Sequence, residues 1–97
     1  MASQIRWSPR AASNLEEICS YIAKDSQHYA SLFAKKILAI VKTIHKFPKS
    51  GRIVPEYKDE NLREKIHQNY RIIYRVKDDI IEIVAICHGA KPLEDIL

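Results

Sequence analysis

Cysteine, glycine and long apolar runs are all scarce in this sequence of 97 residues. Its two cysteines, Cys19 and Cys87, lie in apolar periodic segments, which favours buried free thiols over the disulfide framework of a secreted protein. Two glycines cannot build a phosphate-cradling loop, and the histidines and cysteines lack metal-ligand spacing, so we expect no cofactor and no metal site. No apolar run approaches the roughly 20 residues of a membrane span, and no signal peptide is evident. We therefore expect a cytoplasmic protein without membrane contact.

What the chain does contain is typical of one folded domain. Its length predicts a single domain over residues 1–97 with a thin core. Hydrophobic residues make up 46% of the chain and charged residues 29%, which is too apolar for an intrinsically disordered protein. The formal charge of +4 favours nucleic acid or an acidic protein segment as a partner, although charge alone selects neither.

The first half of the chain predicts a short strand at Gln4 to Trp7 and then two amphipathic helices. Ser8-Pro9 supplies a helix cap followed by proline at the first helical position. Apolar residues then recur at helical spacing in two stretches, which are separated at Asp25-Ser26. The second stretch ends before Pro48, because proline disfavours helix at the residue that precedes it. These two helices should form a hairpin.

The second half of the chain predicts a three-stranded antiparallel meander, because its apolar residues switch to a period of two. A two-residue turn at Asp78-Asp79 sorts the last two strands into one apolar face and one mixed face. The expected strands are Leu62 to Ile66, Tyr70 to Lys77 and Ile80 to Cys87. The expected apolar pairs are Val76 with Ile81, Tyr74 with Ile83, Ile72 with Ala85 and Tyr70 with Cys87, and those on the mixed face are Arg75 with Glu82, Ile73 with Val84 and Arg71 with Ile86.

The mixed face is expected to point away from the helices and to be both basic and apolar. A three-residue turn at His67-Gln68-Asn69, with Asn69 in the left-handed region, would oppose Ile66 to Tyr70 and leave Glu64 on the helix side. If the helices cover only the other face, the apolar residues of the mixed face would be exposed unless a partner binds them. The alternative is that the first strand or the tail with Leu93, Ile96 and Leu97 covers them. The mixed face would gather Arg63, Lys65, Arg71 and Arg75 with Ile73, Val84 and Ile86.

A series of short motifs accompanies this predicted order of elements: Trp7-Ser8-Pro9, Phe47-Pro48, Gly51-Arg52, Pro55-Glu56, Arg63, Tyr70-Arg71-Ile72, Tyr74 and His88. With them, nearly the whole chain resembles the RelE/ParE superfamily of bacterial toxins. The resemblance implies an α+β fold: a short strand, a helix hairpin and an antiparallel meander, with the helices on one face of the sheet. It also implies a toxin of a type II toxin-antitoxin (plasmid stabilisation) system, in a hetero-oligomer with a cognate antitoxin that wraps the hairpin and the sheet. The exposed apolar residues Ile73, Val84 and Ile86 would then bind the antitoxin.

Two activities share this fold, which does not choose between them. ParE-like members inhibit DNA gyrase by protein contact, whereas RelE-like members cut mRNA on the ribosome. The tail resembles the ParE-like pattern, in which a histidine closes the last strand, here His88, and a basic residue follows three positions later. That residue is Lys91, where arginine is common, and lysine lacks its planar fork. No tyrosine follows Tyr74, although nucleases of the superfamily often have one, so the gyrase inhibitor without catalytic residues is favoured.

The residues expected to contact the target are basic. The nuclease alternative would place Lys65 and Arg71 on the scissile phosphate, with His88 or Glu56 as acid or base. Each of these also has a purely structural interpretation, as a solvated sheet face, a strand end or an ordinary loop carboxylate. A further alternative is a non-toxic chain that acts as a co-repressor with its antitoxin. The predicted target-binding residues are Arg52, Arg63, Lys65, Arg71, His88 and Lys91.

Overall fold

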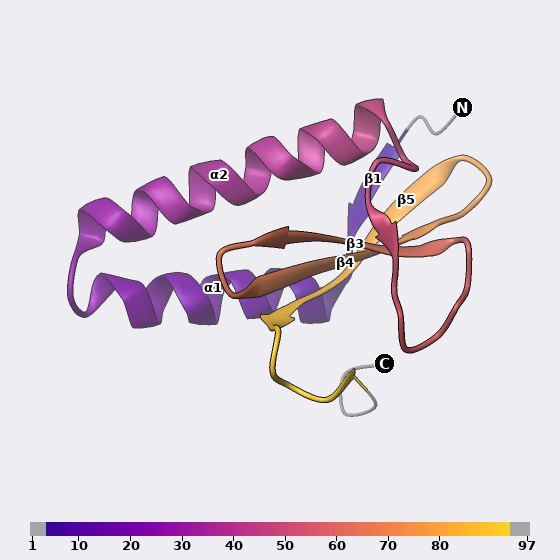
Figure 1. The fold of residues 1–97 in the computed structure, drawn as a ribbon. Coiled ribbons are helices and arrows are strands. Elements are labelled where there is room, and N and C mark those ends of the chain that lie inside the picture. The colour runs from indigo at the N-terminus through magenta and orange to yellow at the C-terminus, as the bar shows by residue number, and fades with distance from the viewer. Residues whose placement is uncertain (1–3, 94–97) are drawn as a thin grey trace.

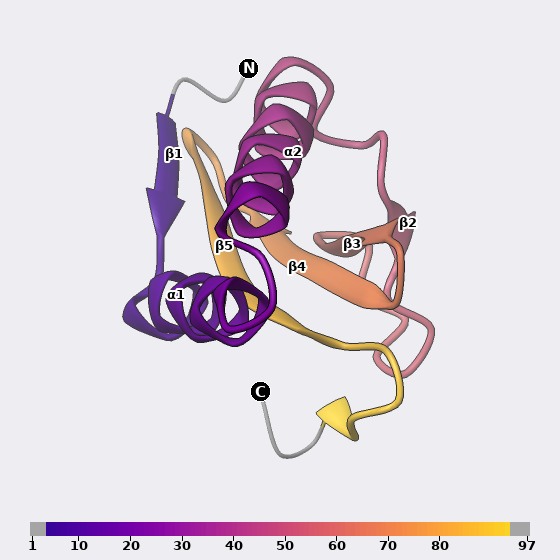
Figure 2. The same cartoon turned by 90° about the vertical axis from the view of Figure 1, so that its left-hand side faces the viewer.

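The computed structural model describes residues 4–93, and it packs two helices on one face of a five-stranded sheet (Figures 1 and 2). The strand order is β1-β5-β4-β3-β2, in which β1 runs parallel to β5 and the other neighbours are antiparallel. The predicted α+β fold is therefore confirmed, with one additional strand, β2. The elements are β1 (Gln4–Trp7), α1 (Pro9–Ala23), α2 (Gln27–Lys46), β2 (Arg52–Ile53), β3 (Leu62–His67), β4 (Tyr70–Val76) and β5 (Ile80–His88).

Both helices begin and end where the sequence predicts. The Ser8 hydroxyl accepts a hydrogen bond from the Ala11 N–H at 3.0 Å, and the Ser26 hydroxyl accepts one from the Tyr29 N–H at 3.1 Å. Each cap satisfies an amide that has no partner within its helix. The apolar stripes of α1 and α2 pack on the sheet through a main core of fully or nearly buried residues: Ala11, Phe33, Ile37, Val41, Ile44, Ile72, Tyr74, Ile81, Ile83 and Ile86.

The turn between β3 and β4 differs from the prediction by one residue. It contains only Gln68 and Asn69, and Gln68, not Asn69, adopts a positive φ, of 54°. His67 therefore opposes Tyr70, and every pair along β3 moves by one position. Because side chains alternate between the two faces of a strand, this shift exchanges the faces of β3. Glu64 lies on the face away from the helices, and the predicted grouping of Arg63 and Lys65 with Arg71 and Arg75 is wrong.

A bulge in β5 changes the last two strands in a similar way. The pairs from Val76–Ile81 to Tyr74–Ile83 are as predicted, but Ile73 then opposes Ala85 because Val84 is an extra residue on β5. The remaining predicted pairs are wrong by one position. Helix α1 supports the bulge, because the Ser8 hydroxyl donates to the Val84 carbonyl at 2.8 Å and the Asn14 side chain accepts from the Ile86 N–H at 3.1 Å.

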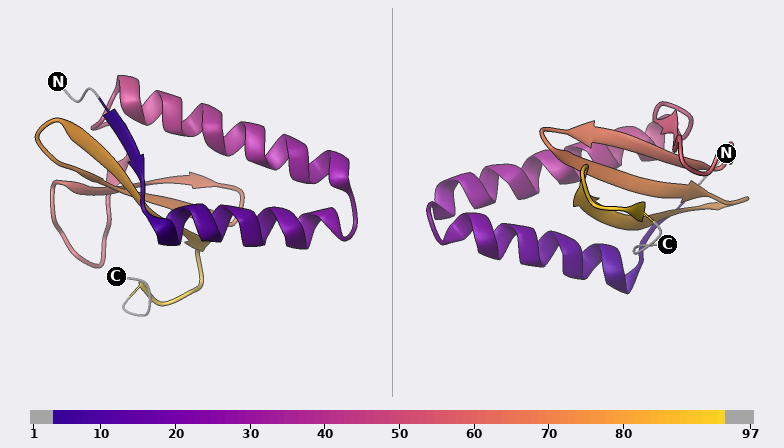
Figure 3. Two further views of the ribbon diagram at one scale, coloured as in Figure 1. Left: turned by 180° about the vertical axis from the view of Figure 1, so that it is seen from behind. Right: turned by 60° about the horizontal axis from the view of Figure 1, so that its bottom comes forward.

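The bulge and the tail together close the expected apolar patch. Ile86 moves to the helix side of the sheet and is 1% exposed, whereas Ile73 stays on the opposite face and is fully buried. Val84 is half-buried. The tail after β5 passes over the face away from the helices (Figure 3) and places Leu93 in a second core cluster with Ile73. The prediction of an open patch at Ile73, Val84 and Ile86 is therefore wrong, and the predicted tail residues Ile96 and Leu97 lie outside the described residues.

Candidate functional site

A buried ionic cluster occupies the face of the sheet away from the helices. The Arg71 guanidinium donates to both carboxylate oxygens of Glu56, at 2.8 and 2.9 Å, and its Nε donates to Glu64 at 2.6 Å. The second carboxylate oxygen of Glu64 accepts from Arg52 Nε at 2.5 Å. Arg71 is 6% exposed and Glu64 is 1% exposed, so the cluster is almost dry at its centre. Such a bidentate, charge-assisted arrangement is among the strong hydrogen-bonding geometries in proteins.

The cluster also fixes the ionisation of its members. Hydrogen bonds from Arg71 lower the pKa of Glu56 to about 2, so this carboxylate is ionised at neutral pH. In return, the hydrogen bonds to Glu56 raise the pKa of Arg71 above its ordinary value. A phosphate could reach this guanidinium only by displacing Glu56. Arg71 and Glu56, two candidates for the nuclease chemistry, are thus bound to each other.

The other predicted basic residues of the sheet, Arg63 and Lys65, make contacts outside this cluster. Arg63 donates to the carbonyls of Glu60 at 2.8 Å and Gly51 at 2.9 Å, and so ties the loops around β2 to β3. Lys65 is half-buried and opposes Ile72 on the helix side of the sheet. The structure therefore does not bring Arg63 and Lys65 together with Arg71, and the six predicted target-binding residues do not form a single site.

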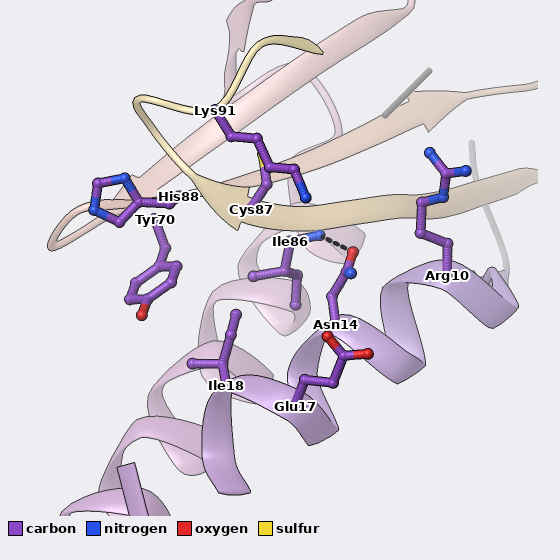
Figure 4. A pocket seen from close by; sticks show the side chains of 9 residues that line it. All are labelled: Arg10, Asn14, Glu17, Ile18, Tyr70, Ile86, Cys87, His88 and Lys91. Carbon is purple, nitrogen blue, oxygen red and sulfur yellow. Dashed lines mark hydrogen bonds between the residues drawn. The ribbon is translucent and has the colours of Figure 1, made fainter. Parts of the chain in front are cut away.

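His88 and Lys91 do lie together, at the rim of a cleft of about 450 Å³ between α1 and the end of β5 (Figure 4). The His88 ring stands edge-on to the Tyr70 ring, with 5.8 Å between centroids, and its Nδ1 accepts from the Ala90 N–H at 3.2 Å. Lys91 and Cys87 line the same cleft. Burial raises the pKa of the Cys87 thiol, so this cysteine is not an activated nucleophile.

Helix α1 supplies the other side of the cleft with three residues that the sequence argument missed, Arg10, Asn14 and Glu17. The signal was present, since their spacing of four and three matches the apolar stripe of α1 and lies one residue before it. In the described part of the chain, this cleft is where predicted site residues from the tail meet polar residues from a helix.

Two features are absent from residues 4–93: a cluster of metal ligands and a helix that could span a membrane. Within this part of the chain, no three histidine, cysteine or acidic side chains converge as metal ligands would. Neither described helix combines the length and the apolar character that crossing a bilayer requires.

Comparisons with known proteins agree with this architecture. The model of the family described as "ParE toxin of type II toxin-antitoxin system, parDE" matches residues 5–93. The chain is 31% identical over 96 residues to "Putative toxin Y4kP" of Sinorhizobium fredii, a match that covers 97% of this chain and 96% of that protein. It also resembles a solved structure of the chromosomal ParDE TA system from P. aeruginosa. That match has a TM-score of 0.72 and 23% identity, and covers 91% of this chain and 96% of the other.

Proposed function

Because the chain belongs to the ParE toxin family of type II toxin-antitoxin systems, we propose that it inhibits DNA gyrase by protein contact and that a cognate antitoxin neutralises it. The family membership identifies a toxin of a ParDE system. The contacts of the charged residues support gyrase over mRNA as the target.

The observation that supports action by contact over RNA cleavage is that Arg71 is buried and already paired with two carboxylates. Cleavage of RNA at the 2′-hydroxyl needs a free cation on the phosphate and convergent groups for proton transfer. Here the Arg71 guanidinium already donates hydrogen bonds to Glu56 and Glu64, and Arg71 is 6% exposed. Lys65 faces the helix side, and His88 lies at the cleft. Of the residues of the nuclease hypothesis, only Arg71 and Glu56 meet, and they bind each other, which favours action by binding alone.

The direct test is the supercoiling of relaxed plasmid by purified gyrase. The toxin is expected to reduce supercoiling when it is in molar excess over gyrase, and antitoxin added first should restore it. A translation extract with ribosomes and message serves as the second arm, in which the message should remain intact. Unaffected gyrase together with cut message would favour the nuclease alternative and overturn the proposal.

The exposed face of α2 is the best-supported surface for the antitoxin now that the sheet patch is closed. The chain has 16 lysines and arginines against 12 acidic residues, and α2 holds four of these lysines and no acidic residue. The formal charge of α2 thus equals the net charge of +4 of the whole chain, and the charged residues of the remaining chain balance one another. Leu38 is 49% exposed between Lys35 and Lys42 on the same helix. A face that alternates lysine with exposed leucine suits an acidic, amphipathic segment.

Reversing charge on this face should weaken antitoxin binding. The double variant Lys35→Glu/Lys42→Glu is expected to raise the Kd for the antitoxin about tenfold or more, because attraction becomes repulsion across the interface. Isothermal titration with the antitoxin encoded beside the toxin gene measures this. Arg10→Glu/Lys91→Glu reverses two charges at the cleft and should leave the Kd nearly unchanged. Equal losses in both double variants would show that net charge, not this face, determines affinity.

A further inference from the structure

The cleft between α1 and the end of β5 has the chemistry of an anion site. Its polar groups come from two elements that the bulge in β5 holds together, since Asn14 on α1 accepts the Ile86 N–H at 3.1 Å. Figure 4 shows Arg10 and Lys91 approaching the space from different elements, with Asn14 on the helix near both. The site is therefore assembled by the fold and does not depend on one helix terminus.

Unlike the arginines of β2, β3 and β4, the cations of this cleft have no partner among the residues that the structure describes. Within residues 4–93, the side chains of Arg10 and Lys91 make no ion pair and no hydrogen bond, and the same is true of the Asn14 amide nitrogen. The described residues thus leave three donor groups unpaired at this cleft. By contrast, each arginine of β2, β3 and β4 already bonds a carboxylate or a carbonyl: Arg52, Arg63, Arg71 and Arg75.

The rest of the lining favours a carboxylate on a protein over a phosphate. Glu17 stands at the cleft, and its negative charge opposes a doubly charged phosphate more strongly than a carboxylate. Ile18 and the Tyr70 ring provide apolar surface that suits the methylene groups of an acidic side chain. A nucleic-acid backbone would require a longer positive track without an intervening acid.

We propose that this cleft receives the carboxylate of an aspartate or glutamate on the protein that the toxin inhibits, with Arg10, Lys91 and the Asn14 amide as its donors. The proposal rests on the proposed function in one respect, that the inhibited protein is gyrase. The carboxylate specificity of the cleft is independent of that identity and is tested separately.

The first experiment uses no gyrase. Amide chemical shifts of ¹⁵N-labelled toxin are followed during titration with millimolar N-acetylglutamate methylamide, N-acetylglutamine methylamide and inorganic phosphate. The carboxylate probe should shift the amides of Ile86 and Lys91 and the Asn14 side chain, and Arg10→Gln should abolish these shifts, whereas Lys42→Gln on α2 should retain them. Equal shifts with the glutamine probe, larger shifts with phosphate, or no shift at all would overturn the carboxylate site.

The second experiment measures the gyrase inhibition itself. Arg10→Glu and Lys91→Glu are each expected to raise the toxin concentration for half-inhibition at least about tenfold, because reversing one member of a charge pair weakens binding by this order. Unchanged antitoxin affinity shows that each variant is folded. If the shifts appear but wild-type toxin leaves gyrase active, the proposed target is wrong and the cleft stands. If wild-type toxin inhibits gyrase and both variants inhibit equally well, the role of the cleft in target binding is wrong.

Discussion

Replacing Arg71 with methionine is expected to lower the free energy of unfolding by about 3–5 kcal/mol, as is usual when one member of a buried ion pair is removed. The substitution leaves the Glu64 carboxylate, which is 1% exposed, with only the largely exposed Arg52 as a partner. It also frees Glu56 and its loop from β4. Since a domain of this size has a total stability of roughly 5–15 kcal/mol, the change should be evident as a large shift of the urea midpoint.

Two further variants separate burial from charge in this result. Arg75→Met removes a more exposed arginine on the same strand, whose distance to Asp59 is 3.8 Å, and should cost less than about 1 kcal/mol. Arg71→Met combined with Glu64→Met removes both buried charges and should recover much of the lost stability. A loss for Arg71→Met no larger than that for Arg75→Met would contradict a structural role of the cluster.

Replacing Gly51 with alanine is expected to cost about 1–3 kcal/mol or more, as overpacking of a closed site does. A Cβ on this residue would lie 2.5 Å from the Tyr74 hydroxyl oxygen and 2.6 Å from the Glu64 carbonyl oxygen. The Tyr74 hydroxyl accepts from the Gly51 N–H at 2.9 Å and donates to the Pro48 carbonyl at 2.7 Å, so it cannot move without losing these bonds. Glycine is therefore required at position 51 because the loop approaches the Tyr74 side chain of β4 closely.

The second glycine is the matched control for this prediction. A Cβ on Gly89 would lie 3.4 Å from the Asn69 carbonyl oxygen and 4.0 Å from Arg71 Cγ, which is ordinary contact. Gly89→Ala should therefore change the urea midpoint little. Similar losses for the two variants would mean that the effect is a general property of glycine replacement and not the close approach at Gly51.

The helices and the order of elements were predictable because their signals are local. Ser8 and Ser26 cap the helices, and Pro48 follows the second one. The assignment of side chains to the two faces of the sheet was less predictable. It depends on the number of residues in each turn and strand, and a difference of one residue changes it. The turn at Gln68-Asn69 is one residue shorter than expected, and Val84 adds one residue to β5. The shorter turn exchanges the faces of β3, and the extra residue moves the side chains of β5 after Val84 to the opposite face.

The candidate site was affected by the same two shifts. On the expected register Glu64 faced the helices, so its pairing with Arg71 could not be foreseen, and Arg71 was interpreted as an available cation. Leu93 of the tail covers the patch at Ile73. Closure by the tail is the alternative that the sequence allowed. His88 and Lys91 lie at the same cleft because they are only three positions apart at the end of β5, so their proximity follows from the sequence alone.

Action of the toxin on gyrase by contact, with message left intact, can be examined in a single culture. The toxin is induced without antitoxin, and plasmid topology and message integrity are measured in the same cells at the onset of growth arrest. We expect loss of negative supercoiling, full-length message, and recovery of both growth and supercoiling when antitoxin is induced. Cut message in cells whose plasmid keeps its supercoiling would contradict this action on gyrase.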